Sequence, residues 1–142
     1  MGGFVNRLML LYNAHMDTKL STKISLEQIN LDFSVCKIAD IKDVDFSRPF
    51  MFLSKTDQEL SLVCETDYVP STATDREDDW KAFRVAGTLD FGMIGVISKL
   101  TSKLAEEGIS VFVVSTYNTD YILVKSYNYK KALHILGGAR YE

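Results

Sequence analysis

The residues most suited to small-molecule chemistry lie in the segment 89–95, which reads LDFGMIG. Gly92 and Gly95 lack a Cβ atom, so a ligand or another backbone can approach them closely. The segment falls where a predicted strand turns into a helix, and the first N–H groups of a helix suit a carboxylate. The alternative is that these glycines only let the helix pack tightly on a sheet. From the turn alone this packing role is favoured.

Asp120 is the second candidate, because it starts a predicted strand next to Thr119 and close to Ser115 and Thr116. A carboxylate in this position can hold an ammonium group through charge-assisted hydrogen bonds. It can equally cap the turn through its own backbone. Both roles stay open from the residues themselves.

Other kinds of chemistry find little support. The formal net charge of −3 argues against nucleic-acid binding, and no apolar run approaches the roughly 18 residues that span a bilayer. Cys36 and Cys64 lie in apolar runs and read as buried thiols of a cytoplasmic protein. His15 and His134 have no evident nucleophile beside them and cannot complete a zinc site. We therefore expect no catalytic residues, metal or cofactor, and segment 89–95 lacks the Lys and Ser/Thr of a nucleotide-binding loop.

The first half of the chain predicts strands and loops. Residues 1–22 are an extension of uncertain origin. Residues 24–31 and 32–38 predict two short strands with a turn near 28–30, and residues 50–54 and 59–64 predict a hairpin. Residues 66–79, which contain the acidic run DREDD, predict a solvated linker.

The second half predicts alternating strands and helices. A strand over 80–85 ends at Gly87, and Thr88 or Asp90 can cap the helix that follows. Phe91, Ile94, Ile97, Leu100 and Leu104 form its apolar stripe, and Gly108 ends it. Strands over 109–115 and 121–125, a helix over 128–136 and a last strand over 139–141 complete the order βαββαβ. This order is that of a ferredoxin-like α+β sandwich.

A short internal repeat links the two halves. The segments FLSKTDQELSLV and VVSTYNTDYILV place Ser54 against Ser115, and Thr56–Asp57 against Thr119–Asp120. Matching hairpin lengths indicate a duplicated unit whose first copy is eroded. The first copy has no long amphipathic helix, so we expect it to complete its core against the second.

The chain resembles the ACT domain, and within it the small tandem-ACT proteins of prokaryotes, to which the cytosolic arginine sensor of animals is related. The resemblance covers about residues 24–136. It rests on LDFSVCKI and TDQELSLVCE in the first half and on the run from WKAFRVAGTLDFGMIG to TDYILV in the second. It implies two ACT-like units that share sheets, a truncated one over 23–66 and a complete one over 80–142, with 67–79 as a linker.

The resemblance also implies a function. ACT pairs hold an amino acid at the interface between units and regulate a partner without catalysis, so we expect a homodimer, a free amino acid as ligand and a regulated enzyme as a further partner. The alternative is a ligand-free module that dimerises or docks onto an enzyme. The ligand-binding residues that the resemblance implies are Asp90, Phe91, Gly92, Met93, Ile94, Gly95, Ile109, Ser110, Val111 and Asp120.

Overall fold

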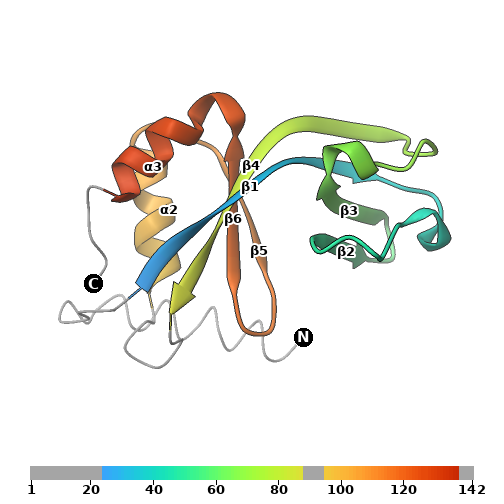
Figure 1. Cartoon of the computed structure of the whole chain (residues 1–142), viewed down its shortest axis with the longest axis horizontal. Helices are drawn as coiled ribbons and strands as arrows, with labels where there is room; N and C mark the ends of the chain where they lie inside the picture. The colour runs from blue at the N-terminus through green and yellow to red at the C-terminus, as the bar shows by residue number, and fades with distance from the viewer. Residues whose placement is uncertain (1–23, 88–94, 138–142) are drawn as a thin grey trace. The chain divides into compact units, whose positions relative to one another are not determined.

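The computed structural model describes residues 24–87 and 95–137. Within them, six strands form a sheet in the order β2-β3-β1-β4-β6-β5. The strands are β1 (Ile24–Lys37), β2 (Met51–Lys55), β3 (Leu60–Glu65), β4 (Asp75–Gly87), β5 (Val111–Ser115) and β6 (Asp120–Lys125). The helices are α2 (Val96–Glu106) and α3 (Tyr129–Gly137), and the short 3-10 turns are η1 (Ile41–Asp43), η2 (Thr66–Tyr68) and η4 (Ser126–Asn128). Figure 1 shows this arrangement.

The chain divides into two compact units. Unit 1 comprises the residues up to Ile29 and those from Phe83 onward, and unit 2 comprises Asn30–Ala82. The long strands β1 and β4 each contribute to both units. The sequence had instead placed the divisions between whole segments, at residues 66–67 and 79–80. Because β1 and β4 each continue from one unit into the other, the amino-acid composition does not change at the boundary between the units, and the sequence does not reveal that boundary.

Unit 1 has the predicted ferredoxin-like topology. Its elements β4, α2, β5, β6 and α3 follow in chain order, and β1 lies beside β4 at the end of the order β1-β4-β6-β5. The sequence predicted that residues 139–141 form the fourth strand of this sheet, in the position that β1 occupies beside β4. Residues 139–141 lie outside the described residues. Instead, the strand paired with β4 comes from the start of the described chain. The α+β class is confirmed.

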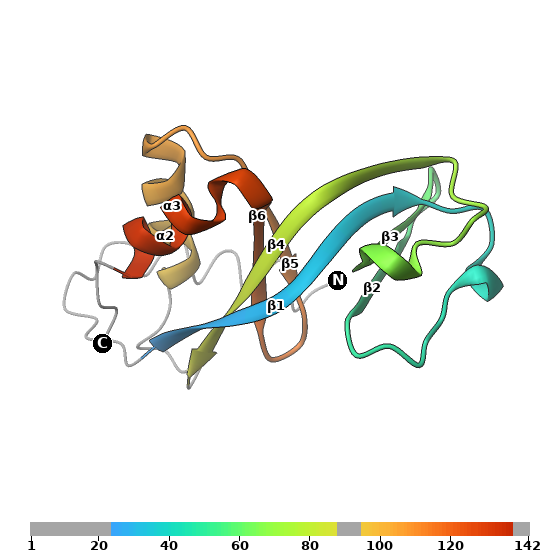
Figure 2. The ribbon, with the colours of Figure 1, turned by 45° about the horizontal axis from the view of Figure 1, so that its top comes forward.

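The core of unit 1 lies between the sheet and its two helices, which pack side by side on one face (Figures 1 and 2). On α2, Val96, Leu100 and Leu104 are buried at four-residue spacing. Leu100 and Leu104 belong to the predicted apolar stripe, whereas Val96 was not predicted and the predicted Ile97 is only partly buried. The other buried members of this core are Phe83, Val85, Ile109, Ile122, Val124, Ala132 and Leu136.

Gly108 ends α2 as predicted. Its φ of +72° is a left-handed conformation that L side chains rarely adopt. The N–H of Gly108 donates to the Ala105 carbonyl, and the N–H of Ile109 donates to the Leu104 carbonyl. These two bonds form a Schellman motif, in which the buried Ile109 side chain supplies the accompanying apolar contact.

Unit 2 repeats the strand order without the helices. Its strands follow the order β2-β3-β1-β4, which corresponds to β5-β6-β4-β1 in unit 1. Residues 38–50, with η1, stand where α2 stands in unit 1, and residues 66–74, with η2, stand where α3 stands. The small core contains the buried residues Cys36, Ile38, Val44, Leu62 and Cys64. The prediction of a truncated first unit therefore agrees with the described chain.

Two sequence predictions for this half were wrong. β1 is one strand of 14 residues, not two strands with a turn at residues 28–30. Ile29 is buried between exposed Gln28 and Asn30, so the polar residues mark an alternating strand. The predicted linker also contains η2 and the first residues of β4, because the exposed charges of DREDD leave the backbone able to pair with β1.

The two hairpins match, but in a different register from the one predicted. Met51 pairs with Cys64 and Lys55 with Leu60, while Val111 pairs with Val124 and Ser115 with Asp120. Each residue of β5–β6 thus lies sixty positions after its equivalent in β2–β3. Thr56 corresponds to Thr116, and Asp120 corresponds to Leu60 rather than to Asp57. The matching Thr-Asp pairs in the sequence were a coincidence of turn composition.

Over the described ranges 24–87 and 95–137, no helix is both long and apolar enough to cross a membrane.

Candidate ligand site

The predicted site residues that the structure describes lie at two opposite ends of unit 1. The β5–β6 hairpin has Ser115 and Asp120 paired at its turn end, and Val111 and Val124 paired at the other end. α2 runs back along the sheet before β5 begins, so its first residue lies toward the turn end (Figures 1 and 2). Gly95 and Asp120 therefore share one end. Ile109, Ser110 and Val111 belong to the other.

Asp120 is a buried carboxylate on the helix side of the sheet. Its side chain is 3% exposed, and it accepts a hydrogen bond of 2.6 Å from the Ser115 hydroxyl. Side chains alternate along a strand, so Asp120 faces the same way as Ile122 and Val124, which pack in the core with α2. Burying a carboxylate costs free energy unless polar groups meet it. The serine hydroxyl opposite it supplies one such group.

Gly95 starts α2 in a left-handed conformation, with φ of +91°. It is the N-cap residue, and as a glycine it has no side chain of its own with which to cap the helix. The predicted caps Thr88 and Asp90 lie outside the described residues. The positive end of the α2 dipole and its first N–H groups lie at the Asp120 end of the unit. The predicted binding residues Asp90, Phe91, Gly92, Met93 and Ile94 are also outside the described residues.

The remaining predicted residues follow the last turn of α2. The side chain of Ile109 is buried in the core, Ser110 is exposed and Val111 is half-buried. α2 has 11 residues, so about 16 Å of helix separates Gly95 from this group. An amino acid is much shorter than this. The structure therefore brings Asp120 and Gly95 toward one end and leaves Ile109, Ser110 and Val111 away from them.

The tyrosines that follow one another closely in the second half of the sequence lie in different places. Tyr117 and Tyr127 are 98% and 81% exposed, but they lie beyond opposite ends of β6. Tyr129 packs near Phe83, with ring centroids 6.5 Å apart, and burial raises its pKa. The two exposed rings therefore do not combine into one surface.

Unit 2 contains two polar networks that no sequence pattern predicted. Arg48 donates two hydrogen bonds to the buried carboxylate of Glu65, at 3.1 and 3.0 Å, and its guanidinium lies 4.3 Å from the centre of the Tyr68 ring. The hydrogen bonds to Glu65 are the main cause that raises the pKa of Arg48. This pair holds residues 38–50, the segment that stands where α2 stands in unit 1, against strand β3. Its residues are 17 apart in sequence, so no local pattern reveals it.

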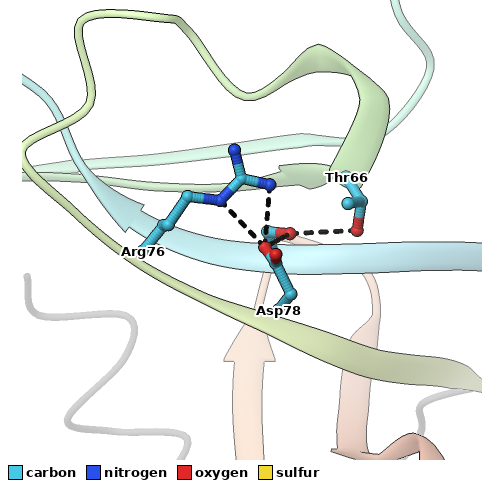
Figure 3. A network of polar contacts seen from close by, with 4 residues as sticks. Thr66, Arg76 and Asp78 are labelled. Carbon is cyan, nitrogen blue, oxygen red and sulfur yellow. Dashed lines mark hydrogen bonds and ion pairs between the residues drawn. The ribbon is translucent and has the colours of Figure 1, made fainter.

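A second polar network joins the other strands of unit 2 (Figure 3). The fully buried Ser34 hydroxyl donates to Asp78 and contacts the Thr66 hydroxyl at 2.9 Å. Arg76 donates to Asp78 through Nε and Nη2, at 3.0 and 2.9 Å. The network therefore ties β1 to β4 and to the start of η2. Among the described residues no group of three or more His, Cys, Asp or Glu side chains is placed to hold a metal.

Comparisons with known proteins agree with this fold. A family model described as ACT domain matches residues 75–137. A solved protein from Agobacterium tumefaciens is 29% identical, with a TM-score of 0.73 over 81% of this chain and 87% of that one. A Vibrio cholerae protein of unknown function is 23% identical, with a TM-score of 0.66 over 94% and 96%. The regulatory subunit of aspartate kinase from Thermus thermophilus is 10% identical, with a TM-score of 0.55 over 84% and 97%. A comparison with curated proteins found no match.

Unit 1 thus has a ferredoxin-like architecture. Residues 75–137 are similar to the ACT domain, a class of regulatory domain that typically binds amino acids. Unit 2 has the same strand order.

Proposed function

We propose that this chain is a regulatory protein of the cytoplasm that binds a free amino acid and has no catalytic activity. The observation that carries the proposal is the buried Asp120 carboxylate, which lies at the end of unit 1 where α2 begins. The match of residues 75–137 to the ACT family supports an amino acid as the ligand class.

Each end of the ligand has a proposed partner. An ionised carboxylate offers about four lone-pair sites, so Asp120 can accept from an ammonium group as well as from Ser115. The N–H groups of Met93, Ile94 and Gly95 would meet the carboxylate of the ligand, helped by the dipole of α2.

The distance across unit 1 favours a dimer. A single amino acid cannot span the roughly 16 Å of α2 between Gly95 and Ile109. If Ile109, Ser110 and Val111 also contact the ligand, they must come from another copy of the chain. We therefore propose a homodimer that binds the amino acid between copies and signals its presence to a partner enzyme.

A thermal-shift screen of the twenty amino acids tests the proposal. A ligand that binds only the folded state at a hundred times its Kd stabilises by about 2.7 kcal/mol, roughly 5–10 °C for a chain of this size. Asp120→Asn should abolish the shift, because a neutral amide cannot pair with an ammonium group. Ser115→Ala should weaken it less, because the carboxylate stays.

Asp57→Asn is the matched control, since Asp57 is an exposed carboxylate in the other hairpin turn. This variant should keep the full ligand shift. If no amino acid raises the melting temperature, or if Asp120→Asn responds like the wild type, the proposed site is wrong. A protein partner captured with equal affinity by wild type and by Asp120→Asn would favour the ligand-free docking module instead.

A further inference from the structure

Unit 2 exposes large apolar side chains on the two segments that stand where α2 and α3 stand in unit 1. Ile41, Phe46 and Tyr68 are 48%, 61% and 37% exposed. The two segments are in contact, because Arg48, two residues after Phe46, places its guanidinium 4.3 Å from the centre of the Tyr68 ring. We call these three apolar residues the Phe46 surface.

Phe46 stands at the tip of a hydrogen-bonded turn. The Asp45 carboxylate accepts from the backbone N–H and from the hydroxyl of Ser47, at 3.0 and 2.5 Å, and the Arg48 N–H donates to the Asp45 carbonyl at 3.5 Å. The Arg48 side chain is bound in turn to the buried Glu65. The residues on both sides of Phe46 are therefore held in place. A ring presented on a fixed turn loses little conformational entropy when a partner covers it.

An exposed aromatic ring on a fixed turn is typical of an anchor in a protein–protein interface. Aromatic residues are enriched in such interfaces, and the few that carry most of the binding energy are surrounded by a polar rim. The charged residues closest in sequence to Phe46 are Asp43 and Asp45, and Asp67 lies in η2. Hydrogen bonds from Ser47 lower the pKa of Asp45, so its carboxylate is charged at neutral pH. A partner for this surface must therefore be basic.

The charges of the chain are divided unequally between its two units. Unit 2 has six basic and twelve acidic residues, a net charge of −6, whereas unit 1 has ten basic and seven acidic residues, a net charge of +3. Unit 2 of one copy therefore repels unit 2 of another and attracts its unit 1. A second copy of the chain thus offers the charge that the Phe46 surface requires.

Four lysines of unit 1 lie on its helices. Lys99 and Lys103 are one turn apart on α2, and Lys130 and Lys131 lie at the start of α3. The two helices pack side by side (Figures 1 and 2). Within the described part of the chain, neither Lys99 nor Lys130 has an acidic partner, whereas Lys131 lies 3.9 Å from Glu107. The helices therefore carry positive charge that an acidic surface can pair with.

We propose that the Phe46 surface of one copy docks on the lysine-bearing helices α2 and α3 of a second copy. The Phe46 ring is the apolar anchor, and Asp43 and Asp67 lie opposite Lys99 and Lys130. This contact does not depend on the proposed amino-acid site, because it uses none of the residues of that site.

Sedimentation of the full chain without added amino acid tests the contact. The mass of the wild type should rise with concentration, and its Kd should rise at least tenfold between 0.1 M and 1 M NaCl, because the Debye length falls from about 10 Å to about 3 Å. Phe46→Ser should weaken association by about thirtyfold, as expected for an interface anchor. Tyr117→Ser is the matched control, since it removes a 98% exposed ring from unit 1, and it should associate like the wild type.

Charge reversal tests which two surfaces meet. The double variants Asp43→Lys/Asp67→Lys and Lys99→Glu/Lys130→Glu should each self-associate at least tenfold more weakly, because each places like charges across the contact. When the two variants are mixed, association should return. The unaltered unit 2 of one variant then meets the unaltered helices of the other, and the reversed charges meet each other.

Three results would overturn the proposal. One is a wild type whose mass depends neither on concentration nor on salt. Another is self-association of Phe46→Ser as tight as that of the wild type. The third is a pair of charge-reversed variants that stay apart on mixing. The amino-acid site is judged separately, because Phe46→Ser should keep the full thermal shift with ligand.

Discussion

Thr56 and Thr116 hold the same turn in two hairpins that lie sixty residues apart. The N–H of Thr56 donates to the Glu59 carbonyl at 2.9 Å, and the N–H of Thr116 donates to the Thr119 carbonyl at 2.8 Å. In both turns the threonine hydroxyl also accepts from the backbone N–H three residues later, at 3.2 and 3.3 Å. The repeat is therefore preserved at its hairpin turns, where local hydrogen bonds decide the geometry. It is not preserved at α2 and α3, because the corresponding segments of unit 2 contain only the short turns η1 and η2.

Replacing either threonine should have the same effect. Thr56→Ala and Thr116→Ala each remove the hydroxyl that accepts from the turn, so each should lower the free energy of unfolding by about 1 kcal/mol. Thr56→Ser and Thr116→Ser keep the hydroxyl and should lose much less. Urea denaturation measures all four. Equal losses for the serine and alanine variants would show that the methyl group, not the hydroxyl, stabilises the turn.

Gly108 and Gly137 should respond in opposite directions to alanine. A Cβ at either position meets nothing within 4 Å, so space is not the difference. Gly108 has φ of +72°, and forcing alanine into this region should cost about 1–2 kcal/mol. Gly137 ends α3 without a positive φ, so alanine there should be neutral or stabilise by up to about 1 kcal/mol. Thermal unfolding of the two variants distinguishes these signs.

Asp79 is strained within β4. Among the described non-glycine residues only Asp79 has a positive φ, at 70°. A β-branched side chain tolerates this conformation poorly, so Asp79→Val should destabilise the protein by about 1–3 kcal/mol. Asp79→Gly should be tolerated. Asp75→Val provides the control, because Asp75 lies exposed on the same strand and valine favours an extended backbone. A valine at 79 as stable as one at 75 would contradict the assigned strain.

The buried cysteines should make the protein less stable in alkali. Burial, and then the neighbouring Cys36, raises the pKa of Cys64 from 9.0 to about 12. Below pH 9 the folded and unfolded chains both hold the proton, so stability is unaffected. Between pH 9 and 12 only the unfolded chain releases it, and the free energy of unfolding falls by up to about 1.4 kcal/mol per pH unit.

Denaturation between pH 8 and 11 measures this slope. Cys64→Ala should be less stable at neutral pH but should lose less stability as the pH rises. Burial also raises the pKa of Cys36 and of Tyr129. Tyr129→Phe is the control for the tyrosine, and it should keep the part of the slope due to Cys64. A slope unchanged by Cys64→Ala would mean that other groups govern the alkaline transition.

Much of unit 1 could be predicted from the sequence because its signals are local. The apolar stripe through Leu100 and Leu104 marks a helix, and Gly108 marks its end. The β-branched run in β5 and the turn before Asp120 mark a hairpin. Each of these features depends on residues within one or two turns of chain. The order βαββα and the ferredoxin-like class follow from them.

The tertiary structure alone decided which distant residues meet. Pairing between strands depends on contacts tens of residues apart, so no local pattern could place β1 beside β4 or Arg48 against Glu65. The same holds for the site: the sequence named Asp120 and Gly95, but the antiparallel course of α2 and β5 put them at one end of the unit and Ile109 at the other. Residue types can propose a chemistry. Only the folded chain determines which groups are close enough to perform it together.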